Sequence, residues 1–429
     1  MAGLIDLMRS ASFNCVNIAD RLIMHKETCR TCKNRVGIAP ILKAATLGLL
    51  SEVKTLLTGG VDASLRYGDS SEISALGAAA LMGNLEVVRT LLEHGVDVDE
   101  CGPDRETALH NTVIHGRADP DLIDLLLSAG ADIDARTVKG FTPLHLATDR
   151  PDSGDAAAIL LRRGAAKDAV DSGGKSALHF AAERGHLAAT RALLAAGADA
   201  TLRIDGALKS APLHMAAHHG QVEVVRELAR HGVDLDAPDV GGFTALHHAA
   251  WKNKAGVVDA LVDAGANVRA ERHTRSSTPL FYALRYLSVE AMRAFLRHGV
   301  GVGLLVVPRR SWSNLKPTPL LHLAAQQGGK DGAAEMVDLL LRWGADESEL
   351  DRDGKTAAEV VPTGGFRGDV LEAISSGVYT EHSLETDADR VRELLANAPA
   401  DRAWRRRGLL ILCLARNQTA RRNSASWGE

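Results

Sequence analysis

Short apolar stretches with helical spacing alternate with polar, glycine-bearing turns along most of this chain. Residues 171–200 are representative: a polar turn at 171–174 precedes Ser176, which stands at a helix N-cap position and can accept hydrogen bonds from the first free N–H groups. A short helix with a small apolar face follows and ends at Gly185. A second helix is predicted over Leu187–Ala195, with its leucines facing inward.

The same unit recurs in register on both sides of this segment. Two helices of about nine residues each are too short to persist alone in water, and their alanine-rich faces bury little area, so neighbouring units must stack. The helix starts are about 33 to 35 residues apart through Thr278 and about 38 to 40 apart beyond it. These predicted starts lie at Ala39, Ser74, Thr107, Thr142, Ser176, Ala211, Thr244, Thr278, Thr318 and Thr356.

The motif at these starts resembles that of the ankyrin repeat family. Its clearest copy is TPLHLA at Thr142–Ala147, followed by a second helix and a closing LL-x-x-GA-D pattern, and related copies recur about nine times over residues 36–361. Threonine can cap the helix, and proline fits the first helical position because no needed hydrogen bond is lost there. The resemblance implies an all-α repeat solenoid, an ankyrin repeat stack in which β-turn or hairpin fingers alternate with antiparallel helix pairs, with helical caps.

Departures from the repeat divide the chain into three predicted regions. Residues 1–35 do not follow the pattern and are predicted to form an N-terminal helical cap. Residues 36–361 are predicted to be the ankyrin repeat array of about nine repeats, with an insertion near 302–316 that lacks the usual finger. Residues 362–429 are predicted to hold a degenerate last repeat, a C-terminal capping helix and a basic mobile tail.

Composition narrows the function classes. A formal net charge of −4 and a pI near 6.5 give no case for nucleic-acid binding. Apolar residues make up 45% of the chain but aromatic residues only 4%, which favours closely packed small helices. The five scattered cysteines indicate a reducing compartment. Asp6 and Arg9 interrupt the first apolar residues, so no secretion signal is expected, and the apolar run Leu409–Ala415 is too short to predict a membrane span. We expect a monomer without a cofactor, located in the cytoplasm or the nucleus.

Two residue sets could suggest metal chemistry. A histidine recurs at one repeat position, but equivalent positions of stacked units lie about 10 Å apart, too far to share an ion with bonds near 2 Å. We expect these histidines to tie one loop to the next by hydrogen bonds; they are His110, His145, His179, His214, His247 and His322. The second set has zinc-like composition, but its spacing is irregular and no second CxxC exists, so we favour reduced cysteines in a helical cap over a zinc site. This set is Cys15, His25, Cys29 and Cys32.

The remaining candidates lie on the surface. The family resemblance implies that partners dock on the concave side, formed by the finger tips and the exposed end of the first helix. An exposed row of aromatic and arginine side chains there would supply the residue types that dominate interface energies. Phe141 and Phe243 have an equally good alternative role, packing between fingers, whereas binding is the favoured role of Trp251 and Tyr286. The predicted protein-binding residues are Phe141, Arg150, Lys175, Glu183, Arg184, His218, His219, Phe243, Trp251, Lys252, Arg285 and Tyr286.

These observations favour a non-enzymatic function. The sequence offers no convergent catalytic set beside a long repeat surface, so the leading hypothesis is a protein–protein interaction scaffold or adaptor that binds protein segments on the concave face. The alternative is the substrate-recognition subunit of an enzyme assembly such as a ubiquitin ligase. A third hypothesis, zinc-dependent nucleic-acid binding by the N-terminal segment, depends on the cysteine set.

Overall fold

Two compact units divide the chain, unit 1 over residues 1–206 and unit 2 over residues 207–429. A computed structural model describes residues 40–64, 73–114, 119–149, 154–204, 209–271, 278–301, 318–328, 330–351 and 353–362.

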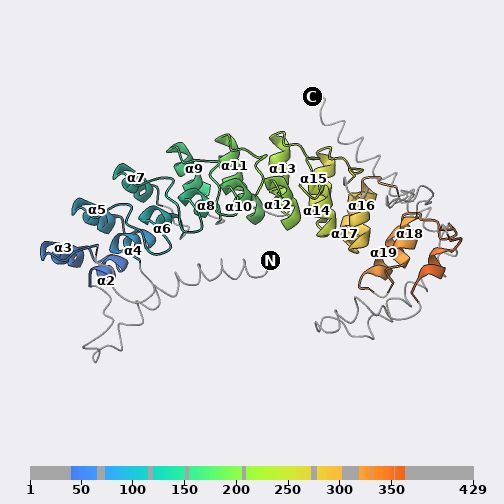
Figure 1. The fold of residues 1–429 in the computed structure, drawn as a ribbon, viewed down its shortest axis with the longest axis horizontal. Helices are drawn as coiled ribbons and strands as arrows, with labels where there is room; N and C mark the ends of the chain where they lie inside the picture. Colours follow the sequence, from blue (N-terminus) through green and yellow to red (C-terminus); the bar gives the residue numbers. More distant parts are fainter. Residues whose placement is uncertain are drawn as a thin grey trace, which may run out of the picture. The chain divides into compact units, whose positions relative to one another are not determined.

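Unit 1 is a row of helix pairs (Figure 1). In each pair a first helix is followed by an adjacent second helix, and first helices pack on first helices while second helices pack on second helices. The first helices are α2 (Pro40–Thr46), α4 (Ala75–Leu81), α6 (Ala108–Ile114), α8 (Pro143–Thr148) and α10 (Ala177–Arg184). The second helices are α3 (Leu50–Thr58), α5 (Leu85–Glu93), α7 (Pro120–Ser128), α9 (Gly154–Arg162) and α11 (Leu187–Ala195).

Unit 2 repeats the same arrangement. Its first helices are α12 (Pro212–His219), α14 (Ala245–Trp251), α16 (Pro279–Arg285) and α18 (Leu320–Ala325). Its second helices are α13 (Val222–Arg230), α15 (Ala255–Asp263), α17 (Val289–Arg297) and α19 (Ala333–Arg342), and the short 3-10 helix η1 (Ala357–Val360) lies against α18.

The helix ends form where the sequence predicts them. Ser74 and Thr278 accept a hydrogen bond at helix N-termini from the backbone N–H three residues on. Ser176 also holds an N-cap position, and Gly185 ends α10 with φ of 81°, a left-handed angle that glycine adopts without the steric penalty of a Cβ. The positions at which these helices begin and end are therefore set by residues next to them in the chain.

Small apolar side chains fill the space between helices. In α14, Ala245, Leu246, Ala249 and Ala250 are all 0% exposed, so two of the helix's faces are closed by neighbours. Alanine lets adjacent helices approach closely, and each fully buried leucine contributes about 1.5 to 3 kcal/mol relative to an exposed one. The core is thus a continuous layer between stacked helix pairs within each unit, and no single helix pair could bury it alone.

Four turns, before α8, α10, α14 and η1, share one backbone hydrogen bond, in which the N–H of one residue donates to the carbonyl four residues on. In unit 1 it joins Thr137 to Phe141 and Asp171 to Lys175, and in unit 2 it joins Asp239 to Phe243 and Asp351 to Lys355. Close approach explains one glycine in these turns: a Cβ on Gly140 would lie 2.9 Å from the backbone nitrogen of Ser172. These closed turns are the fingers that the sequence predicts.

The all-α repeat stack that the sequence predicts is confirmed for the described residues. The predicted caps at 1–35 and after 362, and the insertion near 302–316, lie outside those residues, so the three-region division stays a prediction. Among the described helices, none combines the length and apolar character that crossing a bilayer requires.

Candidate protein-binding surface

The histidines of the repeat motif are structural ties within each unit. The backbone N–H of Thr107 donates to Nδ1 of His110, and Nε2 of His110 then donates to the carbonyl of Phe141 at 3.1 Å. His145 repeats the pattern, with Nε2 at 3.0 Å from the carbonyl of Lys175. His214 and His322 bind the carbonyls of Ala237 and Lys355 in the same way. The predicted loop-to-loop role is confirmed for these four histidines.

Burial favours the neutral form of His110 and His145 by lowering the pKa of each ring. His110 is 0% exposed, and burial lowers its pKa to about 4 although the hydrogen bond to the Phe141 carbonyl favours the charged form. Burial also lowers the pKa of His145. Because the described residues include no group of three or more His, Cys, Asp or Glu side chains placed to hold a metal ion, these histidines form no shared ion site there. The predicted cysteine set with Cys15, His25, Cys29 and Cys32 lies outside the described residues.

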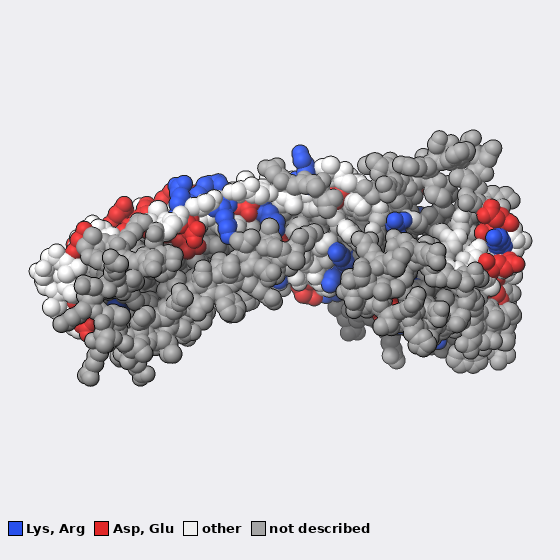
Figure 2. Space-filling model, turned by 60° about the horizontal axis from the view of Figure 1, so that its bottom comes forward, with Lys and Arg blue, Asp and Glu red and all other residues white. Residues whose placement is uncertain are grey.

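In unit 1 the charged side chains that the sequence assigned to binding pair with one another. Lys175 Nζ lies 2.7 Å from a carboxylate oxygen of Glu183, and both side chains are mostly buried, at 18% and 23% exposure. Arg184 Nε lies 2.9 Å from Asp149 Oδ1. The left part of Figure 2, which holds unit 1, likewise has acidic and basic side chains next to one another. A partner would have to compete with these ion pairs. Arg150 lies outside the described residues.

Phe141 is half-buried and packs within unit 1. Its ring lies 5.6 Å from the Phe180 ring in an edge-to-face arrangement and 6.2 Å from His145, while Lys175 Nζ sits 5.3 Å from the Phe180 ring centre. The packing role weighed for Phe141 is therefore present in the structure.

In unit 2 aromatic rings form a continuous row across three neighbouring first helices. His218 near the end of α12 lies 5.8 Å from Trp251 at the end of α14, and Trp251 lies 5.6 Å from Tyr286, which follows α16. We call His218, Trp251 and Tyr286 the aromatic ladder. His218 and Trp251 are half-exposed, and Tyr286 is 48% exposed. The helices α12, α14 and α16 pack side by side (Figure 1). Because the ladder rings also contact one another in sequence, they form one contiguous surface.

A buried second layer supports the ladder. Phe243 stacks on Trp251 at 6.3 Å and meets Tyr282 edge-to-face at 5.2 Å, and Tyr282 stacks on Tyr286 at 6.2 Å. Of the two roles predicted for Phe243, the structure shows the packing role: the ring is 8% exposed because Trp251, Tyr282 and His248 cover it. Phe243 thus fixes the ladder from beneath.

A buried His–Asp pair completes this layer. His248 Nε2 donates to Asp239 Oδ2 at 3.0 Å, Asp239 Oδ1 accepts from the backbone N–H of Phe243 at 2.9 Å, and neither side chain of the pair exceeds 2% exposure. Burial raises the pKa of Asp239, but these hydrogen bonds and the nearby histidines outweigh it, and the net pKa is lowered. His248 also contacts the rings of His218 and Trp251. The pair therefore holds two of the three ladder rings in place.

Sequence reasoning did not find His248, Asp239 or Tyr282. The available signals were the doubled histidine in the segment TALHHAAW and an aspartate at the finger position that Asp171 and Asp351 also occupy. Neither signal says which rings meet, since contacts such as Phe243 to Tyr282 and His218 to His248 join residues from different repeats.

Basic side chains border the ladder. Lys252, at the C-cap of α14, is exposed and places Nζ 4.8 Å from the centre of the Trp251 ring, a cation–π distance. Arg285, the last residue of α16, is also exposed, as is His219 beside His218. Five of the predicted binding residues of unit 2 are thus brought together with partial or full exposure: His218, His219, Trp251, Lys252 and Tyr286. A sixth, Arg285, precedes Tyr286 in the chain.

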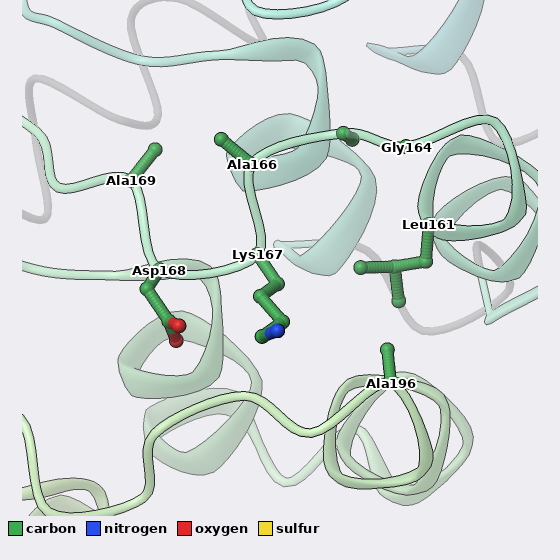
Figure 3. Close-up of a pocket in the computed structure, with 8 residues that line it drawn as sticks. Leu161, Gly164, Ala166, Lys167, Asp168, Ala169 and Ala196 are labelled. Atoms are coloured by element: carbon green, nitrogen blue, oxygen red, sulfur yellow. The ribbon is translucent and has the colours of Figure 1, made fainter.

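Unit 1 also has a pocket between the ends of α9 and α11 (Figure 3). Its walls are mostly small: Leu161, Gly164, Ala165, Ala166, Ala169 and Ala196 line it with Lys167 and Asp168. Asp168 already accepts a hydrogen bond from the backbone N–H of Asp199 at 2.8 Å. The pocket therefore lacks the aromatic rings and convergent polar groups that make the ladder a candidate.

Comparison with known proteins agrees with this architecture. A family model described as ankyrin repeats in three copies matches residues 7–102, 109–204 and 178–272, which together cover more than half of the chain. The chain belongs to the ankyrin repeat family. The repeats of this family are protein-interaction modules, and the histidine ties, fingers and helix pairs described above are its structural elements in this chain.

Similar curated proteins are ankyrin repeat proteins of several kinds. The Caenorhabditis elegans "Ankyrin repeat and KH domain-containing protein mask-1" is 28% identical over 53% of this chain and 8% of its own length. The Mus musculus "B-cell lymphoma 3 protein homolog" is 32% identical over 47% of this chain and 37% of its own length. The Homo sapiens "Ankyrin repeat and SOCS box protein 6" is 34% identical over 33% of this chain and 32% of its own length. The chain thus spans well under half the length of each of these relatives.

Proposed function

We propose that this protein is a non-enzymatic interaction scaffold or adaptor, and that it binds a segment of a partner protein on the aromatic ladder of unit 2. The ladder lies on the face formed by the first helices. The resemblance to the ankyrin family implies that this face is the concave side. The observation that carries the proposal is a contiguous, partly exposed row of His218, Trp251 and Tyr286 set on a buried second layer.

The ladder has the properties of an interface hot spot. Tryptophan and tyrosine dominate measured binding energies because they bury large areas with few rotatable bonds. Rings fixed from below by Phe243 and Tyr282 lose little further freedom on binding, so more of the contact energy is available for affinity. The self-paired charges of unit 1 would first have to be separated, which makes that unit the weaker candidate.

Substitution of Tyr286 tests the proposal. With the full chain as bait, we expect Tyr286→Ala to lose the partner proteins that the unsubstituted protein recovers, since removing one hot-spot aromatic costs about 2 kcal/mol, or about thirtyfold in affinity. Trp251→Ala should act in the same direction, and thermal unfolding separates its effect on stability from its effect on binding.

Met82→Ala is the matched control. Met82 holds the C-cap position of α4 in unit 1, as Tyr286 does for α16 in unit 2, and the two side chains are similarly exposed, at 43% and 48%. We expect this variant to retain every partner. If Tyr286→Ala and Trp251→Ala recover the same partners as the unsubstituted chain, with equal affinity, the ladder is not the binding surface.

The second candidate function is substrate recognition within an enzyme assembly such as a ubiquitin ligase. One observation favours it, the similarity over 143 residues to a protein whose name joins ankyrin repeats with a SOCS box. Both functions use the repeats to recognise a protein, so co-purification distinguishes them: ligase subunits recovered with the full chain, and retained by Tyr286→Ala, would favour the second candidate.

A further inference from the structure

The first helices of unit 2 carry cations and no acids. The described segments 211–221, 244–254, 278–288 and 318–328 span these helices and the turns that follow them, and they contain no Asp or Glu. The basic residues in the same segments are Lys252, Lys254 and Arg285. In unit 1 the corresponding segments of α8 and α10 contain acids, Asp149 and Glu183, and these are paired with Arg184 and Lys175.

The cations beside the ladder are not neutralised within the described part of the chain. Lys252 and Arg285 are exposed and make no ion pair with a described residue, whereas every arginine in the second helices of unit 2 is paired with a carboxylate. Asp239, which lies in the layer beneath the ladder, has a side chain that is 0% exposed and is bound to His248. Asp234, an exposed acid of the same finger, lies in the turn after α13 and accepts the backbone N–H of Asp236.

We propose that the ladder binds an acidic peptide segment, with an apolar or aromatic side chain against the rings and carboxylates against Lys252 and Arg285. This inference rests on the proposed function and names its partner class. Opposite charges at an interface raise the association rate and reject wrong partners, and carboxylates are the peptide groups that complement an ammonium and a guanidinium.

The ladder's size limits the spacing of the partner's residues. The ring centres lie 5.8 Å apart from His218 to Trp251 and 5.6 Å apart from Trp251 to Tyr286. An extended peptide needs about three to four residues to span both distances. The apolar side chain and at least one carboxylate of the segment should therefore lie within about four positions of each other.

A peptide fits better than a nucleic acid. Nucleic-acid affinity depends on many phosphates neutralised along a continuous basic surface, typically about six to ten contacts. Lys252, Lys254 and Arg285 are too few for such a surface, and exposed acids of unit 2 such as Asp234 and Glu223 would repel a polyanion. A single-stranded oligodeoxythymidine serves as the competing probe, because its bases could stack on the ladder rings.

Selection from a phage-displayed library of random peptides against the full chain tests the inference. We expect peptides lost by Trp251→Ala or Tyr286→Ala to be enriched in Asp and Glu close to an apolar residue. For a synthetic selected peptide, fluorescence anisotropy should give binding weakened about tenfold or more by the double reversal Lys252→Glu, Arg285→Glu. A peptide with its acids replaced by Lys should recover affinity for that double variant.

The double reversal Arg226→Glu, Arg342→Glu is the control. It changes net charge equally, on the exposed faces of α13 and α19, and should leave affinity within about twofold. Ladder-dependent peptides that are not acidic, or an equal loss in both double variants, would overturn the acidic-segment inference while the proposed function stands. An oligodeoxythymidine that binds the ladder more tightly than the selected peptides would overturn it as well. If no selected peptide depends on Trp251 or Tyr286, the proposed function fails, and the inference fails with it.

Discussion

Acid should destabilise unit 1 through the buried histidines of its repeat motif, and His110 allows the effect to be calculated. The folded-state pKa of His110 is about 4, whereas an exposed histidine in the unfolded chain titrates near 6.5. Between these two values the unfolded state binds more protons than the folded state, so the free energy of unfolding falls as pH falls. The loss begins near pH 6.5 and is complete near pH 4.

The magnitude follows from the interval that is crossed. From pH 6.5 to pH 5 the loss is about 1.4 kcal/mol per pH unit, or about 2 kcal/mol from His110 alone. His145 adds to the loss in the same direction, because burial lowers its pKa too. Total domain stabilities are about 5 to 15 kcal/mol, so this change is large enough to measure.

The assay compares the unsubstituted chain with His110→Gln, whose amide does not titrate. Urea unfolding followed by circular dichroism should find the variant less stable at pH 7, since a buried carbonyl, that of Phe141, loses its imidazole donor. At pH 5 the difference between the two proteins should shrink by about 2 kcal/mol, because only the unsubstituted protein has His110 to protonate. The pKa itself can be read from the imidazole NMR signals.

Two results would refute this reasoning. One is a difference in unfolding free energy that stays constant from pH 7 to pH 5. The other is a His110 resonance that titrates near 6.5, which would mean that the Nε2 to Phe141 hydrogen bond does not hold the ring in a neutral, buried state.

Two further predictions concern unit 2. Phe295→Ala should lower the free energy of unfolding by about 3 to 5 kcal/mol, because the ring is 0% exposed and its removal leaves a cavity beneath α17. A urea unfolding curve measures this change, and a loss below about 1 kcal/mol would contradict the prediction. Asp239→Ala should cost about 2 to 4 kcal/mol, because it leaves the buried N–H groups of His248 and Phe243 without an acceptor. Because the pKa of Asp239 is lowered in the folded state, its contribution to the free energy of unfolding is present above about pH 4 and is lost below. The difference in stability between the unsubstituted protein and Asp239→Ala should therefore persist from pH 7 to pH 5 and shrink only in stronger acid.

Much of the fold could be predicted from the sequence because its determinants are local. Ser176 and Gly185 flank α10 as its N-cap and C-cap, so the residues that set where this helix begins and ends lie next to it in the chain. The hydrogen-bonding role of His110 and His145 followed from repeat geometry alone, since a ring at the same position in each unit faces the next loop. The regular spacing of the helix-start motifs also made the resemblance to the ankyrin family recognisable.

The candidate site was only partly predictable. The sequence nominated Trp251 and Tyr286 as rings with exposed surface, and both have it. For Phe243 it left binding and packing equally open, and only the contacts with neighbouring rings decide that this side chain is buried. Lys175 and Glu183 also looked like free surface charges, whereas they are paired at 2.7 Å and mostly buried. Repeat position tells which face of a helix a residue occupies, and it does not tell how deeply the neighbours cover it.

The sequence by itself therefore determined the helix pairs, their caps and the histidine ties, because each depends on residues close together in the chain or at a fixed repeat position. Only the tertiary structure decided which rings form the ladder and which charges remain unpaired beside it. Trp251 and Tyr286 are separated by a full repeat, as are Asp149 and Arg184. Contacts of that kind exist only after stacking has brought neighbouring first helices together, and stacking is set by the packing of the whole buried layer.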